Sequence, residues 1–180
     1  MNEMDMCHLM IDLETLGTQS SSVIMSIGAV QFDLRGNTKE VLYKKISIQS
    51  CLDAGLQVDG STIEWWLAQD SKNTQKLMEG ERYKLETVID ELSYFSMDQN
   101  QNSWYVWSHG SIFDIVLLEN AYKAVGRKTW WDYRNVRDTR TLFDVVNYRY
   151  KASGAHDALE DAMNQAKAVQ EAYQLLKGGN

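Results

Sequence analysis

Short apolar runs at the start of the chain predict three β-strands. The runs cover residues 7–13, residues 23–33 (VIMSIGAVQFD) and residues 39–48 (KEVLYKKISI), and a turn-forming RGN separates the last two. Apolar runs of this length, bounded by turn residues, are typical of strands. The first part of the chain is therefore expected to form a meander.

Helical periodicity begins after residue 60. The segment STIEWWLAQD predicts a helix, because Ser61 and Glu64 have the spacing of a capping box with Ser61 as the N-cap. A longer helix is predicted over residues 84–97, where apolar side chains recur on one face at the helical period: Leu85, Val88, Ile89, Leu92 and Phe95. This second helix is expected to pack on the sheet.

Strands and helices alternate in the second half of the chain. Residues 104–108 (WYVWS) predict a buried strand, and a helix over residues 112–125 follows, terminated by Gly126. A short strand around residues 133–137 precedes two helices, one starting near Thr139 and one running from Asp157 to about Leu176. Strands first and alternation later predict an α/β fold with a mixed, five-stranded central sheet flanked by helices.

The composition fits a single domain over residues 1–180, with 44% apolar residues to build a sizeable core. The N-terminal MNEMDMCHLM has acids where a signal peptide has bases, and no apolar run approaches the roughly 18 residues of a membrane span. Cys7 and Cys51 lack CxxC spacing and a nearby His-rich cluster, so we expect buried free thiols. These features predict a cytoplasmic protein with no membrane partner.

The charge is acidic overall but unevenly distributed. A net charge of −7 disfavours general affinity for polyanions. Residues 123–151, however, hold eight Lys or Arg against three Asp, which makes this segment locally +5. The segment either follows a phosphate backbone or forms a solvated surface of mixed charge.

Two carboxylates in MIDLETLG, Asp12 and Glu14, have the spacing of side chains on one face of a strand. Because strand side chains alternate, Asp12 and Glu14 project together, while Ile11 and Leu13 point into the opposite layer. Two carboxylates on one face repel unless cations lie between them, and such oxygen ligands suit Mg²⁺ or Mn²⁺. The pair indicates a metal site; the alternative is a strand end that exposes two acids to water.

A third acid follows the predicted fourth strand. Asp114 in SHGSIFD comes three positions after Ser111, the spacing of a capping box, which places Asp114 in the first turn of the next helix. Acids at such positions often only complement the helix dipole. Taken alone, Asp114 is thus either a helix cap or a further ligand at the edge of the sheet.

The HDALED segment combines a histidine with an acid. Inside one helix, His156 and Asp161 would point about 140° apart and could not share a site. Asp157 and Glu160 form a capping box of their own, however, which makes Asp157 the predicted N-cap. His156 then lies in the preceding loop, where Gly154 gives freedom to aim the imidazole, and Asp161 lies on the first turn. This arrangement suits a general base beside a metal ligand; the alternative is a surface histidine.

In combination, these motifs resemble a known superfamily. The order D-x-E, then D, then H-x-x-x-x-D resembles the DEDDh branch of the DnaQ-like 3'-5' exonucleases, which have a ribonuclease H-like fold. DLETLGT followed by TIEWWLAQ is similar to small phage and prophage exonucleases and to the Rv2179c-like exoribonucleases. One position departs from the pattern, because many members have Asn where this chain has Gly110.

The resemblance implies a metal-dependent 3'-5' exonuclease acting on single-stranded DNA or RNA and releasing nucleoside 5'-monophosphates. Two divalent ions, Mg²⁺ or Mn²⁺, would be held by four acids, namely Asp12, Glu14, Asp114 and Asp161, while His156 deprotonates the attacking water. Residues directly after the first acids, Thr15, Leu16 and Gly17, would contact the terminal nucleotide. The relatives form dimers, so a homodimer is possible, and TWWDY at residues 129–133 would serve either its interface or the core.

Two adjacent tryptophans are candidates for stacking on an unpaired base. Since neighbouring helical residues point about 100° apart, one should face the site and the other the core, and we assign Trp66 to the site. The remaining tryptophans are expected in the core or at an interface: Trp104, Trp107, Trp130 and Trp131.

Two alternatives to the exonuclease remain. One is a nucleic-acid-binding module that kept the fold without turnover, and the other is a metal-dependent phosphohydrolase of small nucleotides. The complete set of four acids and one histidine argues against the first, because binding alone does not require a base.

Overall fold

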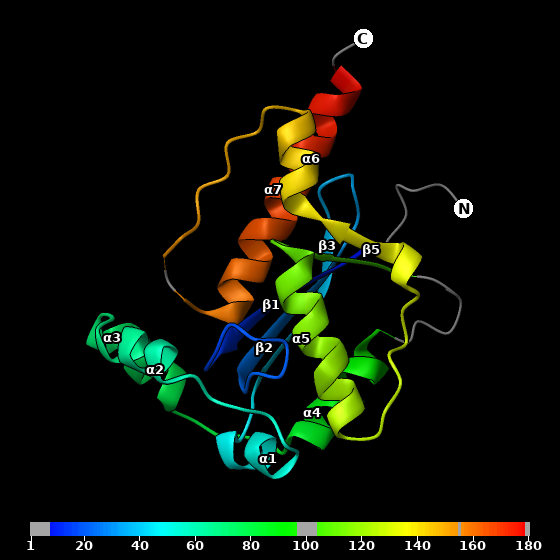
Figure 1. The fold of residues 1–180 in the computed structure, drawn as a ribbon. Helices are drawn as coiled ribbons and strands as arrows, with labels where there is room; N and C mark the ends of the chain where they lie inside the picture. The colour runs from blue at the N-terminus through cyan, green and yellow to red at the C-terminus, as the bar shows by residue number, and fades with distance from the viewer. Residues whose placement is uncertain (1–7, 97–103, 155, 179–180) are drawn as a thin grey trace.

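A mixed five-stranded sheet forms the centre of the molecule (Figure 1). The computed structural model describes residues 8–96, 104–154 and 156–178. The strands follow the order β3-β2-β1-β4-β5, with bounds β1 His8–Thr15, β2 Ile24–Phe32, β3 Thr38–Lys45, β4 Tyr105–Ser108 and β5 Val136–Asp138. β1, β2 and β3 pair antiparallel, whereas β4 and β5 continue the sheet in parallel with β1. The predicted meander and mixed α/β sheet are confirmed.

Helices cover both faces of this sheet. Their bounds are α1 Ile48–Asp53, α2 Gly60–Leu67, α3 Ser71–Met78, α4 Leu85–Phe95, α5 Ser111–Ala124, α6 Thr139–Val145 and α7 Ala158–Gly178. One apolar cluster joins the sheet to α4 and α5, and a second joins its other face to α6 and α7. In the described part of the chain, no helix is long and apolar enough to cross a membrane.

The alternation along β1 decides which of its side chains reach which layer. Leu9, Ile11 and Leu13 belong to the cluster with α4 and α5, while Met10 belongs to the cluster with α7. Side chains two apart share a face. Asp12 and Glu14 are therefore on the α7 face of β1, next to the first turn of that helix, which confirms the predicted common face.

A glycine in β2 sets how closely α7 approaches the sheet. Gly28 pairs with Asp12 across the β1/β2 ladder. A Cβ atom built on Gly28 would lie 2.1 Å from the carbonyl oxygen of Ala158, the first residue of α7. No real Cβ atom tolerates that distance, so the backbone of α7 rests directly on the backbone of β2. This contact brings the start of α7 beside Asp12.

Several predicted helix starts are wrong. α2 begins at Gly60 with Asp59 as N-cap, because the Asp59 carboxylate accepts hydrogen bonds from both the backbone N–H and the hydroxyl of Ser61. α5 begins at Ser111, so Ser111 is not an N-cap; that position is held by Gly110 at φ 108. The Ser111 backbone N–H donates to Asp138, at the end of β5, over 2.7 Å. The cap of α5 is thus supplied by a distant residue.

The last strand is also displaced from its predicted range. Residues Tyr133–Asn135 form a 3-10 turn, whose first N–H groups are capped by Asp132, and β5 follows at Val136–Asp138. The sequence analysis also missed α1 and α3. α1 has only six residues, and α3 (SKNTQKLM) is too polar to show an apolar stripe.

Cysteine and tryptophan burial largely follow the predictions. Cys51 is a free, fully buried thiol in the cluster beneath α4 and α5, whereas Cys7 lies outside the described residues. Trp104, Trp107 and Trp131 are buried, and Trp130 packs partly buried against the same core as Trp131. The core role of TWWDY is therefore confirmed for its two tryptophans.

We predict that Gly28→Ala destabilises the protein. The added methyl group would push the first turn of α7 away from β2, and overpacking of this kind costs about 1 to 3 kcal/mol. A thermal melt should show a lower Tm. Gly60→Ala is the matched control, because a Cβ at Gly60 meets nothing within 4 Å. An unchanged Tm for Gly28→Ala would mean that α7 does not rest on β2 as closely as described.

Candidate active site

The residues singled out by the motifs converge on one pocket. Its volume is about 250 Å³, and its lining includes the predicted set of Asp12, Glu14, Asp114, His156 and Asp161. They come from four different places: β1, the first turn of α5, the loop before α7 and the first turn of α7. Segments that are distant in sequence thus form a single acidic site.

Three of the acids are close enough to hold one cation together. The carboxylate oxygens of Asp12, Glu14 and Asp161 lie within 4.8 Å of one another. Asp114 lines the same pocket from the α5 side but is not within that group. Carboxylate oxygens are the ligands that Mg²⁺ and Mn²⁺ prefer. The donor set of these three acids therefore fits a divalent metal ion.

Burial and mutual repulsion perturb these carboxyl groups strongly. Burial raises the pKa of Asp12 to about 7, and the nearby Asp161 adds to the rise. Burial likewise raises the pKa of Glu14 to about 9, helped by the charges of Asp12 and Asp161. Burial and Asp12 raise the pKa of Asp114 well above its ordinary value. Without a cation, the site keeps part of its charge neutralised by protons.

Neighbouring polar side chains orient two of the acids. The Gln165 side-chain N–H donates to Asp12 Oδ1 over 2.7 Å, and Gln165 also lines the pocket. The Ser153 hydroxyl donates to Asp161 Oδ1 over 2.8 Å. Since a hydrogen-bonded carboxylate has fewer free rotamers, these contacts favour a preorganised ligand set.

The structure places His156 in a loop, as the capping analysis predicts. The Asp157 carboxylate accepts from the Glu160 backbone N–H over 3.0 Å, which confirms Asp157 as the N-cap, and α7 begins at Ala158. Asp157 also pairs with Lys76 of α3 at 2.9 Å. His156 itself has a left-handed backbone, with φ 50. The loop therefore turns sharply at His156 before the fixed start of α7.

Both tryptophans of α2 lie beside the acidic site, and they differ in burial. Trp66 is buried in the core, and its indole N–H donates to the Thr15 carbonyl over 2.9 Å. Trp65 is the outward residue, with 44% of its surface exposed. Both rings meet the His156 ring edge to face, at 5.0 Å for Trp65 and 5.9 Å for Trp66. The packing of α2 on the core decides which of the two rings is exposed.

A second pocket continues from the acidic one. It has a volume of about 450 Å³ and shares Leu13, Glu14 and Phe113 with the acidic pocket. Its remaining lining residues are Thr15, Gly17, Thr18, Ser61, Thr62, Trp65 and Trp66. We call this space the aromatic pocket.

The three predicted contact residues after Glu14 differ in their placement. Thr15 and Gly17 line the aromatic pocket, but Leu16 is buried in the core. A Cβ on Gly17 would lie 2.4 Å from the Ser22 hydroxyl oxygen, so packing against Ser22 already requires a glycine there. Packing within the fold therefore accounts for a glycine at position 17 without a contact to a nucleotide.

Five residues that line the pocket were not predicted from the sequence: His109, Phe113, Tyr150, Ala152 and Gln165. Gln165 follows Asp161 by one helical turn, a spacing that could have revealed it. Tyr150 is in a loop, and its hydroxyl is buried without a hydrogen-bond partner in the described structure. Burial, then Asp161 and Asp12, raise the pKa of Tyr150 to about 12. No periodic signal marks Tyr150 or His109.

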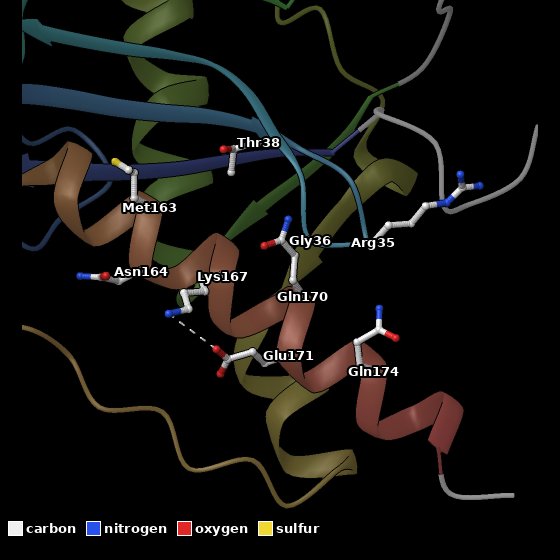
Figure 2. A pocket seen from close by; sticks show the side chains of 9 residues that line it. All are labelled: Arg35, Gly36, Thr38, Met163, Asn164, Lys167, Gln170, Glu171 and Gln174. Carbon is white, nitrogen blue, oxygen red and sulfur yellow. Dashed lines mark ion pairs between the residues drawn. The ribbon is translucent and has the colours of Figure 1, made fainter.

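Another pocket, of about 440 Å³, lies between the β2–β3 turn and residues 163–174 of α7 (Figure 2). Two of its glutamines hold that turn in place: Gln170 donates to the carbonyls of Asp33 and Asn37, and Gln174 donates to that of Leu34. Its charged residues include Lys167 and Glu171, which face each other at 3.9 Å. Glu171 is the single acid among the residues that line this pocket, so they offer no carboxylate cluster for a metal ion.

The fold and the acidic pocket together define a class of protein. The E. coli exonuclease I complex with single-stranded DNA and zinc aligns with a TM-score of 0.63 and 15% identity, over 96% of this chain and 40% of that chain. Exonuclease I of Methylocaldum szegediense aligns with a TM-score of 0.59 and 13% identity, over 94% of this chain and 42% of that chain. This chain thus spans less than half the length of these exonucleases. The predicted ribonuclease H-like fold of the DnaQ-like exonucleases is confirmed.

The family can be stated more narrowly. The chain belongs to the 3'-5' exoribonuclease Rv2179c-like domain family, whose match covers residues 7–173. The predicted superfamily is thereby confirmed. No protein among the curated ones matches the chain.

We predict that Glu14→Gln stabilises the metal-free protein. Since the folded-state pKa of Glu14 is raised to about 9 from 4.5, the folded protein binds the proton more tightly, and its free energy of unfolding falls as pH rises between these values. Glutamine has no ionisable proton, so the free energy of unfolding of the variant lacks this decrease with pH. In chelator, the Tm of the variant should exceed that of the wild type by several degrees at pH 8 and by little near pH 4.5.

The control for this comparison is Glu40→Gln, which changes an exposed acid on β3. Its Tm difference should be small at both pH values. Adding Mg²⁺ should raise the Tm of the wild type more than that of Glu14→Gln, because the variant has lost a carboxylate ligand. A Glu14→Gln stability gain that is independent of pH would contradict the burial of an ionisable group at this position.

Proposed function

We propose that the chain is a metal-dependent 3'-5' exonuclease that hydrolyses phosphodiester bonds from the 3' end of single-stranded DNA or RNA and releases nucleoside 5'-monophosphates. The observation that carries this proposal is the convergence of Asp12, Glu14, Asp114, His156 and Asp161 on one pocket. Membership of the Rv2179c-like family supports the reaction class. The single-stranded DNA in the exonuclease I complexes supports the type of ligand.

Four acids would hold two divalent ions: Asp12, Glu14, Asp114 and Asp161. Such ions, Mg²⁺ or Mn²⁺, lower the pKa of a bound water and neutralise the charge of the scissile phosphate. Gln165 and Ser153 keep Asp12 and Asp161 aimed inward through their hydrogen bonds. The raised pKa values of Asp12 and Glu14 are consistent with a site built to carry cations instead of protons.

His156 is proposed to take the proton from the attacking water. Its loop lies at the rim of the acidic pocket, and no helix backbone restrains its ring. The tryptophans Trp65 and Trp66 meet the imidazole edge to face, which limits its orientations and shields one of its sides from solvent. A base next to the acids would act on a water held at the phosphate.

The aromatic pocket is proposed to receive the terminal nucleoside. It adjoins the acids at Glu14, so a base placed there would leave its 5'-phosphate near the acidic cluster. Trp65 and Phe113 offer partly exposed rings at this pocket, with 44% and 36% of their surfaces exposed. Stacking on an aromatic ring is tolerant of base identity, which suits an enzyme that removes nucleotides in succession.

The central prediction concerns turnover. With Mg²⁺ or Mn²⁺, the protein should shorten 5'-labelled single strands from the 3' end, and Asp12→Asn or His156→Gln should reduce the rate by at least about a hundredfold. Asp53→Asn changes an exposed acid on α1 and should retain the wild-type rate. Matched DNA and RNA strands, single and duplex, should be compared side by side on denaturing gels.

Other outcomes identify the alternatives. Metal-loaded protein that leaves every oligomer intact but binds it in the presence of chelator would show a binding module. Cleavage of mononucleotide esters without cleavage of oligomers would show a phosphohydrolase of small nucleotides.

A further prediction separates the two tryptophans. Trp65→Ala should raise KM for an oligonucleotide about tenfold with a folded protein, because it removes an exposed stacking surface. Trp66→Ala should lower the Tm by many degrees, because it empties a buried site and loses the hydrogen bond to Thr15. Steady-state kinetics and thermal melts check both. Equal KM values for Trp65→Ala and the wild type would exclude stacking on Trp65.

A further inference from the structure

Three exposed cations lie next to residues of the acidic pocket wall, in sequence or in space. Arg140 is the second residue of α6, and Arg149 and Lys151 belong to the segment that connects α6 to α7. All three side chains are exposed. Within the ranges that the structure describes, none of them forms an ion pair. We call Arg140, Arg149 and Lys151 the basic rim.

Arg140 lies over the backbone at the start of α5. A Cβ atom on Gly110 would be 3.1 Å from the central carbon of the Arg140 guanidinium. The guanidinium therefore occupies space that a side chain at position 110 would need. The preceding residue, Thr139, shares a 2.7 Å hydrogen bond with the ring of His109, a residue of the acidic pocket. Arg140 is thus placed at the pocket edge formed by His109.

Arg149 and Lys151 flank a second residue of the pocket wall. The residue between them, Tyr150, lines the acidic pocket, and its ring lies 4.9 Å from that of His109. Tyr150 also packs against Phe143 of α6. Tyr150 faces inward and its two sequence neighbours are exposed, so both cations lie on the solvent side of this stretch of the pocket wall.

The arrangement of the two pockets indicates the direction in which a bound nucleic acid strand would run. The aromatic pocket adjoins the acids at Leu13, Glu14 and Phe113. His109 and Tyr150 line the acidic pocket only, and not the aromatic one. A strand whose last base enters the aromatic pocket would place its scissile phosphate on the acids. Its remaining nucleotides would then leave past His109 and Tyr150.

We propose that the basic rim binds phosphates of the substrate strand on the 5' side of the scissile bond. The inference rests on the proposed exonuclease function and adds the path of the substrate. Arg and Lys side chains neutralise phosphates and release counterions, which strengthens binding at low salt. The three cations form no ion pair in the described part of the chain, so none has to be broken when a phosphate binds.

The test compares a long and a minimal substrate. A 5'-labelled ten-nucleotide single strand reaches the basic rim, whereas the p-nitrophenyl ester of thymidine 5'-monophosphate has the scissile phosphate but no upstream nucleotides. Arg140→Gln, Arg149→Gln and Lys151→Gln should each lower the ratio of kcat/KM for the oligomer to that for the ester, by about tenfold at low salt. Each should also reduce the slope of log kcat/KM against log salt by about 1.

Lys128→Gln is the matched control. It removes the same charge from an exposed site beyond the C-terminal end of α5, whereas the pocket is at the N-terminal end of that helix. The ratio should not change in this variant. If all three rim variants behave like Lys128→Gln, or lower both rates equally, the basic rim does not hold upstream phosphates.

Binding measurements separate this inference from the proposed function. Fluorescence anisotropy of the labelled oligomer in chelator reports affinity without turnover. If the wild type cleaves nothing, the exonuclease proposal fails. The role of the basic rim is still supported if its three variants bind the oligomer more weakly and Lys128→Gln does not. It is overturned if all four variants bind the oligomer as the wild type does.

Discussion

The contact between the first turn of α7 and β2 is the constraint on which the site depends. Gly28 has no side chain, so the carbonyl of Ala158 can approach the strand more closely than any Cβ would allow. Gly28 is also the ladder partner of Asp12. The same close approach therefore brings Asp161, one turn into α7, within range of Asp12 and Glu14. A larger residue at position 28 would push the first turn of α7 away from β2 and so move Asp161 away from Asp12 and Glu14.

This proximity has an electrostatic cost that the rest of the fold must offset. Asp12, Glu14 and Asp114 all have raised pKa values because they are buried near one another. Each polar contact in the pocket opposes that cost only in part: Gln165 donates to Asp12, and Ser153 donates to Asp161. Two extended apolar clusters on either face of the sheet supply the stability that tolerates such a site. Perturbed carboxyl groups held by a rigid scaffold are typical of functional sites.

Local sequence patterns were sufficient to predict those features that depend on neighbouring residues in the chain. The alternation in β1 predicted the common face of Asp12 and Glu14, and the capping box at Asp157 predicted the loop position of His156. Contacts between distant segments could not be predicted in this way. Asp138 caps α5 from β5, and the packing of α2 on the core makes Trp65 the exposed ring and Trp66 the buried one. Tyr150 and His109 meet only because α6 and its following loop fold back over the end of β4.

The formal charge of the chain is a poor guide to what its pocket presents to a polyanion. The value of −7 counts every carboxyl group as ionised, but a Glu14 pKa of about 9 keeps that group mainly protonated at neutral pH. Cations at the acids would reduce the negative charge further, while Arg140, Arg149 and Lys151 form no ion pair within the described structure. Because electrostatic interactions are screened over about 8 Å at physiological salt, a phosphate in the pocket responds to these neighbours more than to acids elsewhere. An acidic protein can therefore present a locally cationic path to a nucleic acid strand.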